Sequence, residues 1–235
     1  MKRLKIVLFI VIIIGILGLL EYKGYIWHNE IFTLGYEVKG LDVSHYQGDI
    51  NWEDINKDKY KFVFMKATEG TTFKDNKFVF NWNKSKEKGI LRGAYHFFSA
   101  ESSGLGQAEN FINTVPKEEY CLPPVIDIEI SLGEDKEIIK KELWDLIISL
   151  EDYYNKKPIL YVTYATYDKY IKGDYLDYDI WIRDIIKFPK LKDDRNWLFW
   201  QYSNRGRVKG IETYVDINVF NGNLEEFNKL FGNNK

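Results

Sequence analysis

The chain has 235 residues and a formal net charge of -2. This length suits one larger domain or two small ones, and the slightly negative charge argues against a nucleic-acid backbone as a partner. The single cysteine, Cys121, excludes an intrachain disulfide bond. Aromatic residues make up 17% of the chain, more than a core needs, and rings with one polar edge are suited to lining a sugar groove.

The N-terminus predicts a helix that targets the chain to a membrane. Basic residues precede an almost unbroken apolar run over residues 6–20, which is typical of a secretory signal or of an uncleaved signal anchor. Because the run ends in a poor cleavage pattern, we predict a retained anchor over residues 1–22, with secretion after cleavage as the alternative. Residues 23–36 would follow as a short stalk outside the cytoplasm.

From residue 37 onward, strand-like and helix-like segments alternate. Short runs rich in β-formers predict eight strands, at residues 38–43, 62–66, 90–97, 125–129, 158–163, 180–183, 198–202 and 214–220. Amphipathic or capped segments predict helices at residues 77–88, 107–115 and 136–154.

This alternation indicates an α/β fold with a parallel sheet. Eight strands without an intervening linker favour one closed barrel over residues 37–235. The outer ring is expected to be incomplete near the last three strands, which lack good helices between them. A doubly wound open sheet is the rival fold, and no Gly-rich phosphate loop supports it.

The strongest candidate for chemistry is the tripeptide Asp127-Ile128-Glu129. Strand alternation puts both carboxylates on one face. Burying them there costs free energy unless they form ion pairs or hydrogen bonds or take part in function. Crowding drives their pKa values apart, and an acid beside a carboxylate can cleave a glycosidic bond. A salt-bridged strand end and half of a metal site are the alternatives.

Other acidic residues end other predicted strands. Asp42 ends the first strand, Glu69 follows the second, and Asp216 lies in the last strand with Asn218 on the same face. Active sites of β/α barrels form at the carboxyl ends of the strands. We therefore expect these acids to collect at one rim, which favours catalysis.

Several segments at the predicted strand ends together resemble the family 25 glycoside hydrolases, the lysozymes of the Chalaropsis type. The resemblance covers residues 38–227. It is carried by Gly40-Leu41-Asp42-Val43-Ser44-His45-Tyr46-Gln47-Gly48, Lys66-Ala67-Thr68-Glu69-Gly70, Gly93-Ala94-Tyr95-His96-Phe97, Asp127-Ile128-Glu129, Trp200-Gln201-Tyr202-Ser203 and Val215-Asp216-Ile217-Asn218-Val219-Phe220.

The resemblance implies an irregular TIM-like barrel with five β/α units and three further strands. It also implies N-acetylmuramidase activity, which cleaves the β-1,4 bond between N-acetylmuramic acid and N-acetylglucosamine in peptidoglycan. The family's acidic cluster maps onto Asp42, Asp127, Glu129 and Asp216. Glu129 falls on the general acid/base.

The role of the second carboxylate is left open by the sequence. Asp127 either stabilises an oxocarbenium-like transition state or orients the substrate's acetamido group as an internal nucleophile. Asp216 or Asp42 could instead attack directly. Our working hypothesis is Glu129 as the acid/base, with Asp127 assisting the acetamido group.

The resemblance also favours substrate contacts by aromatic residues at strand ends. The predicted binding residues are Tyr95, Tyr161, Trp181, Trp200 and the acidic Glu69, and barrel packing is the alternative for each ring. His45 and His96 are expected to be hydrogen-bonded residues that either stabilise the fold or support the site residues from behind. No metal and no cofactor is expected.

One segment departs from the family pattern. After Trp181-Ile182 the family usually continues with a small residue and then an aromatic residue, whereas Arg183-Asp184 follows here. This departure predicts a different cleft shape or substrate preference. It leaves the acidic cluster intact.

Three rival functions are less consistent with the sequence. A family 18 chitinase-like hydrolase would need another Asp where Val125 stands, and a metal-dependent deacetylase would need paired histidines at ligand spacing. A binding module without catalysis has no reason to keep crowded carboxylates. The expected partners are peptidoglycan glycan strands and, through the N-terminal helix, a membrane, and the protein is expected to be a monomer.

Overall fold

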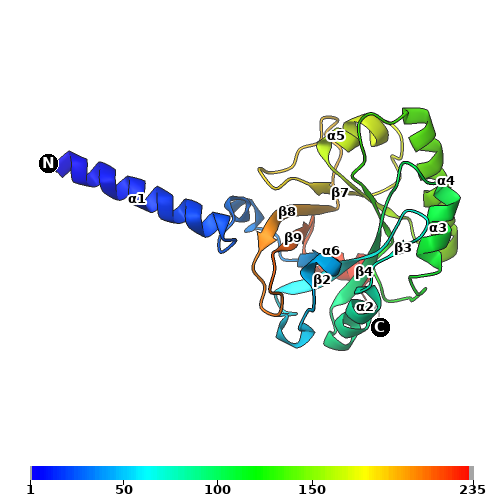
Figure 1. The fold of residues 1–235 in the computed structure, drawn as a ribbon, viewed down its shortest axis with the longest axis horizontal. Helices are drawn as coiled ribbons and strands as arrows, with labels where there is room; N and C mark the ends of the chain where they lie inside the picture. The colour runs from blue at the N-terminus through cyan, green and yellow to red at the C-terminus, as the bar shows by residue number, and fades with distance from the viewer. Residues whose placement is uncertain (1, 233–235) are drawn as a thin grey trace.

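Eight strands close into a barrel in the computed structural model, which describes residues 2–232. The helix α1 (Lys2–Tyr22) projects from the side of this barrel (Figure 1). The barrel strands are β1 (Lys39–Val43), β2 (Tyr60–Glu69), β4 (Leu91–Phe97), β5 (Val125–Ile128), β6 (Ile159–Val162), β7 (Ile180–Arg183), β8 (Phe199–Gly206) and β9 (Val215–Phe220). A two-residue strand, β3 (Phe73–Lys74), pairs with the end of β2.

The pairing of the strands makes the barrel irregular. Successive strands from β1 to β8, leaving β3 aside, are parallel neighbours. β9 is antiparallel to both β8 and β1 and thereby closes the circle. The predicted irregular barrel is confirmed, and the rival open sheet is wrong.

Helices and short helical turns surround the strands. The helices are α2 (Phe78–Lys88), α3 (Gly104–Ile112), α4 (Lys136–Tyr154), α5 (Tyr164–Thr166), the π-helical turn η4 (Tyr167–Ile171) and α6 (Leu224–Phe231). The 3-10 turns are η1 (His28–Thr33), η2 (His45–Gln47) and η3 (Trp52–Asp54). Three of these helices, α2, α3 and α4, were predicted, whereas α6 was missed although Asn223 and Glu226 form a reciprocal capping box at its start.

The two best-defined outer helices begin at side-chain caps. Asp135 accepts hydrogen bonds from the first backbone N–H groups of α4, and Asn155 ends that helix in the left-handed conformation. Ser103 caps α3 by accepting from the N–H of Gly106 (3.2 Å). This cap explains why α3 begins three residues earlier than predicted; the helix also ends three residues earlier, at Ile112.

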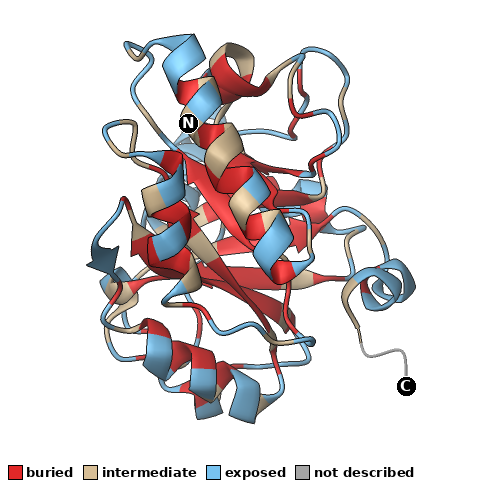
Figure 2. Cartoon of the chain, turned by 90° about the vertical axis from the view of Figure 1, so that its right-hand side faces the viewer, coloured by how far each residue is buried: buried red, intermediate tan, exposed pale blue. Residues whose placement is uncertain are grey.

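The barrel separates two apolar cores. The larger one lies between the strands and the outer helices, and Figure 2 shows helices whose buried residues face the strands. The smaller core fills the barrel interior and is mainly aromatic. Its buried members are Val38, Phe62, Phe64, Leu122, Val125, Ile159, Tyr161, Trp181, Phe199, Phe220 and Phe227. These side chains form an apolar floor beneath the polar rim.

Close packing of this floor depends on a glycine in β1. A Cβ on Gly40 would lie 2.3 Å from Cε2 of Phe62. The Phe62 ring is fully buried and packs against other rings, including Phe199 at 4.9 Å between centroids. The ring therefore has little room to move away.

The segment predicted as a stalk is fastened to the barrel. The indole N–H of Trp27 donates to the carbonyl of Tyr202 (2.7 Å), and the fully buried Asn29 donates to the carbonyls of Asp184 and Tyr202 (3.1 Å each). Residues 23–36 thus carry ordered contacts to strand β8 and to the residue after β7.

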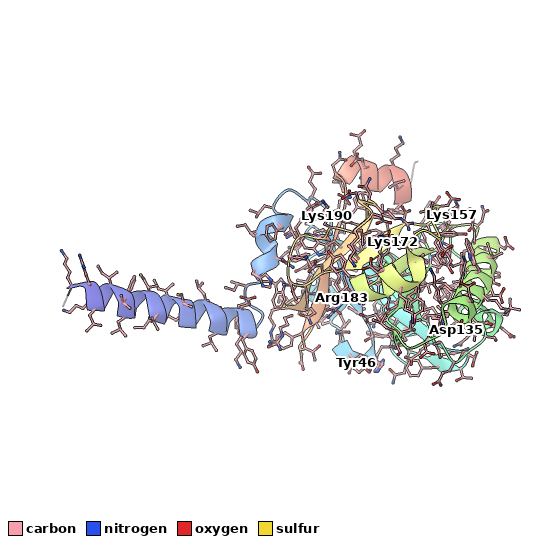
Figure 3. The ribbon with its side chains drawn as sticks, turned by 90° about the horizontal axis from the view of Figure 1, so that it is seen from above. Tyr46, Asp135, Lys157, Lys172, Arg183 and Lys190 are labelled. Carbon is pink, nitrogen blue, oxygen red and sulfur yellow. The ribbon has the colours of Figure 1, made fainter. Side chains whose placement is uncertain are left out.

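The end of α1 is held by the β8–β9 hairpin. The Arg205 guanidinium and the Tyr214 hydroxyl donate to the carbonyl of Tyr22 (2.7 and 3.2 Å), and Arg207 donates to the carbonyl of Lys23 (3.1 Å). Figure 3 shows the α1 side chains projecting on all sides. By length and composition this helix could cross a membrane, and a signal sequence would meet the same criteria.

The Gly40 contact generates a stability prediction. Gly40→Ala should lower the free energy of unfolding by about 1–3 kcal/mol, because the added methyl overpacks a fully buried ring. The matched control is Gly35→Ala, where a Cβ meets no atom within 4 Å, and its effect should stay within about 0.5 kcal/mol. Urea denaturation measures both. Equal stabilities for the two variants would contradict the packing argument.

Candidate active site

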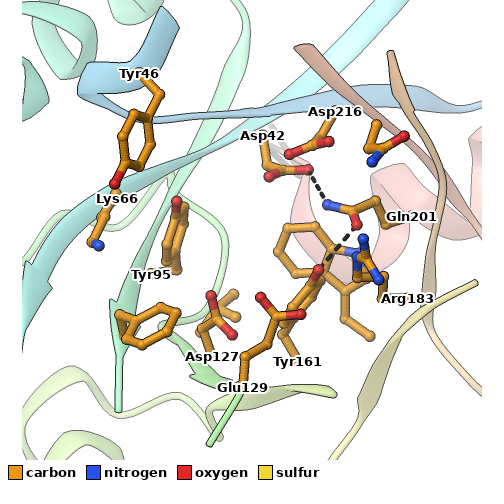
Figure 4. Close-up of a pocket in the computed structure, with 14 residues that line it drawn as sticks. Asp42, Tyr46, Lys66, Tyr95, Asp127, Glu129, Tyr161, Arg183, Gln201 and Asp216 are labelled. Atoms are coloured by element: carbon orange, nitrogen blue, oxygen red, sulfur yellow. Dashed lines mark hydrogen bonds between the residues drawn. The ribbon is translucent and has the colours of Figure 1, made fainter. Parts of the chain in front are cut away.

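A cavity of about 360 Å³ opens at the carboxyl ends of the parallel strands (Figure 4). It brings together side chains from elements that are far apart in the sequence. Its lining comprises Asp42, Tyr46, Lys66, Tyr95, Phe97, Val125, Asp127, Glu129, Tyr161, Trp181, Arg183, Gln201, Asn204 and Asp216. All four carboxylates of the predicted acidic cluster are in this set.

Strand β5 positions Asp127 and Glu129. Val125, Asp127 and Glu129 line the cavity, while the alternate residues Ile126 and Ile128 are buried in the outer core. The prediction that both carboxylates share one face is confirmed. Asp127 is 8% exposed, whereas Glu129, just after the end of β5, faces the open cleft.

Closure of the barrel by β9 places Asp42 opposite Asp216. The two residues are directly paired in the antiparallel β1–β9 ladder. One carboxylate oxygen of Asp42, Oδ2, accepts hydrogen bonds from the side-chain amides of Asn218 (2.8 Å) and Gln201 (3.1 Å). Both amides are themselves oriented, because Asn218 accepts from Trp181 Nε1 (3.0 Å) and Gln201 accepts from the Tyr161 hydroxyl (3.0 Å).

These contacts give the carboxyl groups of Asp42 and Asp216 different pKa values. Burial raises the pKa of Asp42 to about 6, and the hydrogen bonds from Asn218 and Gln201 oppose that rise. Burial and the neighbouring charge of Asp42 raise the pKa of Asp216 well above its usual range. Of the two carboxyl groups, Asp42 therefore ionises more readily, and Asp216 more strongly favours its protonated form.

Asp127 and Glu129 form the second coupled pair. Burial, followed by the nearby charges of Glu129 and Asp42, raises the pKa of Asp127 well above its usual range. Desolvation in the cleft wall also raises the pKa of Glu129, although the Arg183 guanidinium opposes this rise. The Oδ1 atom of Asp127 is buried and has no hydrogen-bond partner among residues 2–232. Such an atom is costly unless it is used.

Three of the four predicted aromatic residues lie at the cavity. Tyr95, Tyr161 and Trp181 line it. Tyr161 and Trp181 are almost fully buried and hold the two amides that bind Asp42. They therefore combine barrel packing with a supporting role at the site. Tyr95 is half-buried and leaves more of its ring to the cleft.

Two predicted binding residues lie elsewhere. The prediction for Trp200 is wrong, because this residue is fully buried in the outer core and its indole N–H donates to the carbonyl of Asp184 (2.7 Å). Alternation in β8 instead turns Gln201 into the cavity. Glu69 does not line the cavity. Its carboxylate forms an ion pair (2.6 Å) with Lys66, and Lys66 does line the cavity.

Two aromatic residues of the lining, Tyr46 and Phe97, were not predicted. Tyr46, 74% exposed, follows β1 in the turn η2, and Phe97 ends β4. Both lie inside segments that carried the family resemblance: Tyr46 is four residues from Asp42, and Phe97 is two residues from Tyr95. Their positions directly at strand ends were the available signal.

The two histidines are hydrogen-bonded, as predicted. His45 Nδ1 lies 2.7 Å from Oδ2 of Asp75. His96 is fully buried between Thr68 (2.7 Å) and Gln107 (3.0 Å), and burial lowers its pKa to about 4. Within residues 2–232, no group of three or more His, Cys, Asp or Glu is arranged to hold a metal ion.

A sequence model of known proteins, described as glycosyl hydrolases family 25, matches residues 41–211. The chain belongs to this family. The match spans strands β1 to β8 and includes Asp42, Asp127 and Glu129. It confirms the resemblance, and it establishes the protein as a glycoside hydrolase.

Individual relatives agree with the family. The structure of a family 25 glycosyl hydrolase from Bacillus anthracis is 49% identical, with a TM-score of 0.79, and the match covers 83% of this chain and 93% of that one. A lysozyme structure from Streptomyces coelicolor is 30% identical, with a TM-score of 0.75 and coverage of 86% and 100%. Lysozyme M1 of Streptomyces globisporus is 32% identical, over 83% of this chain and 72% of its own length.

The raised pKa of Asp42 in this family 25 enzyme predicts a pH-dependent stability. The folded state holds the Asp42 proton more tightly than the unfolded chain does. The resulting stabilisation is present below about pH 4 and is lost as the pH rises through about 6. A rise in pKa from 3.8 to about 6 corresponds to about 3 kcal/mol.

Asp42→Asn removes this ionisation. Between pH 4 and pH 7.5, its free energy of unfolding should therefore gain up to about 3 kcal/mol relative to the wild type. Urea denaturation at the two pH values measures this change. Glu212→Gln, at an exposed position, is the control and should track the wild type. Parallel stabilities of Asp42→Asn and the wild type at both pH values would contradict the assignment.

Proposed function

We propose that this family 25 enzyme hydrolyses peptidoglycan by cleaving the β-1,4 bond between N-acetylmuramic acid and N-acetylglucosamine. The observation that carries the proposal is the convergence of four carboxylates with raised pKa values in one cleft. Cleavage of a glycosidic bond needs a protonated acid and an ionised partner within reach of one sugar. Relatives named as lysozymes support peptidoglycan as the substrate.

Glu129 is the proposed general acid/base. It faces the open cleft, so a glycosidic oxygen can approach it, and its raised pKa favours the protonated form needed for the first step. Donation of this proton to the leaving oxygen breaks the bond. The resulting carboxylate then takes a proton from the water that completes hydrolysis.

Asp127 is the proposed partner of the acetamido group. Its carboxylate lines the cavity and the residue is 8% exposed, so the accessible part of the carboxylate is suited to accept the amide N–H of the substrate. This hydrogen bond would hold the acetamido oxygen against the anomeric carbon. A proton on Glu129 removes the charge that raises the pKa of Asp127, so the acid on Glu129 and the carboxylate on Asp127 support each other.

The Asp42–Asp216 pair is less suited to direct attack. The Oδ2 atom of Asp42 already accepts hydrogen bonds from two amides. Burial and the charge of Asp42 raise the pKa of Asp216, and the protonated form that this favours is a weak nucleophile. We propose that this pair contributes to the electrostatic potential of the cleft. Their negative charge would favour a positively charged transition state.

The acid/base assignment predicts the effect of Glu129→Gln. This variant should lower kcat on purified peptidoglycan by about 10²–10⁴-fold, because glutamine cannot donate the proton. Reducing-end analysis of the digest measures the rate and the bond together. Normal turnover by Glu129→Gln would refute the assignment.

The identity of the new reducing ends tests the bond specificity. New muramic-acid ends are expected, whereas glucosamine ends would indicate a glucosaminidase or a chitinase-like enzyme. Binding without cleavage would indicate a glycan-binding barrel. The matched variant Asp127→Asn should also lower kcat.

We further propose that α1 is a retained membrane anchor and that the barrel lies outside the cytoplasm. The apolar run of α1 and the hydrogen bonds that fasten its end to the barrel support this location. Fractionation of cells should recover the enzyme in the membrane fraction with its N-terminus intact. Recovery of the protein in the medium, without residues 1–22, would support signal cleavage instead.

A further inference from the structure

One basic side chain of the cavity, Arg183, forms no ion pair with the carboxylates that line it. Arg183 and Lys66 are the basic residues of the lining, and they stand on opposite sides of the pocket in Figure 4. Lys66 is paired with Glu69 at 2.6 Å. Among residues 2–232, the Arg183 side chain has no hydrogen bond and no carboxylate oxygen within 4.0 Å.

Strand geometry explains why Arg183 enters the cleft and Asp184 does not. In β7, Trp181 and Arg183 line the cavity, whereas Ile182 is buried in the outer core. The next residue, Asp184, accepts from the Tyr164 hydroxyl (2.9 Å) and from the backbone N–H groups of two loop residues (3.0 Å each). The Asp184 carboxylate therefore accepts its hydrogen bonds from Tyr164 and from the loop after β7, and it forms no ion pair with Arg183.

The position of Arg183 links it to the reacting sugar. Its charge acts on Glu129 and on Asp216, lowering the pKa of each. It stands two strands from Asp127, with β6 between them, a spacing of about 10 Å across the sheet. One sugar ring held by Asp127 and Glu129 fits this span together with a substituent.

Charge complementarity identifies the group that Arg183 would bind. A guanidinium presents a planar fork of N–H donors that matches a carboxylate. In a muramic-acid residue, the acetamido group is on C2, and the lactyl ether, which carries a carboxyl group, is on the adjacent O3. A sugar whose acetamido group meets Asp127 therefore presents a substituent with a carboxylate nearby.

We propose that Arg183 is a specificity residue that binds a carboxylate carried on the muramic-acid O3 substituent. This inference rests on the proposed function. The carboxylate has two possible sources. It is the lactyl carboxylate itself in glycan strands without peptides, or a carboxylate of the attached peptide where the lactyl group is amide-linked.

Three glycan substrates test this inference with the full-length enzyme in detergent. The first is peptide-free strands with free lactyl carboxylates, the second is the same strands with these carboxylates converted to methylamides, and the third is strands that retain their peptides. The wild type should show a kcat/KM about ten-fold higher, mainly through KM, on the first than on the second. If the peptide supplies the carboxylate, the third substrate should be preferred over the second, with no difference between the first and the second.

Arg183→Met should abolish whichever preference the wild type shows. Arg183→Lys should retain part of it, because the charge remains without the planar fork. Each ratio compares two substrates on one enzyme sample, so it does not depend on the fraction of folded protein. Lys187→Met is the control: it removes a nearby exposed charge that is outside the cavity lining, and its ratios should match the wild type.

The outcomes separate this inference from the proposed function. Equal kcat/KM of the wild type on all three substrates, or a preference that persists in Arg183→Met, would overturn the role of Arg183 while muramidase action stands. Absence of cleavage on every substrate would overturn the proposed function itself. Arg183→Met should also move the alkaline limb of the pH profile to higher pH on all substrates alike, since it removes the charge that lowers the pKa of the general acid Glu129.

Discussion

Desolvation of carboxylates above an aromatic floor is the constraint on which the site depends. The rings inside the barrel leave the acids at the rim with little water beneath them. Burial is the largest cause of the raised pKa at each of the four carboxylates. The same packing that stabilises the barrel thus favours the protonated forms of the acids at the rim.

The antiparallel strand β9 brings a further carboxylate to the rim, so that the four acids form two pairs. The parallel strands bring Asp42 and Asp127 to the rim at their carboxyl ends, but Asp216 reaches the same rim near the start of its strand. Asp42 and Asp216 therefore form one proton-sharing pair, and Asp127 and Glu129 form another. Gln201 and Asn218 connect the first pair to the aromatic rings of the floor, so the protonation of the site is coupled to its packing.

Much of this arrangement could be predicted from the sequence, and the failures have physical reasons. Alternation placed Asp127 and Glu129 on one face, because their strand has a clear apolar boundary. Alternation could not choose between Trp200 and its neighbours in β8, because both faces of a barrel strand are buried and both carry large side chains. The attachment of residues 23–36 was also hidden, since Trp27 and Asn29 bind backbone carbonyls, which carry no sequence signature.

The hydrogen bonds between the end of α1 and the β8–β9 hairpin would limit the reach of the enzyme if α1 remained in a membrane. The carbonyls at and just after the end of the helix accept hydrogen bonds from Arg205, Arg207 and Tyr214. The chain that follows is bound to the barrel through Trp27 and Asn29. An enzyme held in a bilayer by this helix would have no long tether on which to search. Its reach would equal the width of its own barrel, and it would cut only the layer of wall that passes directly over the membrane.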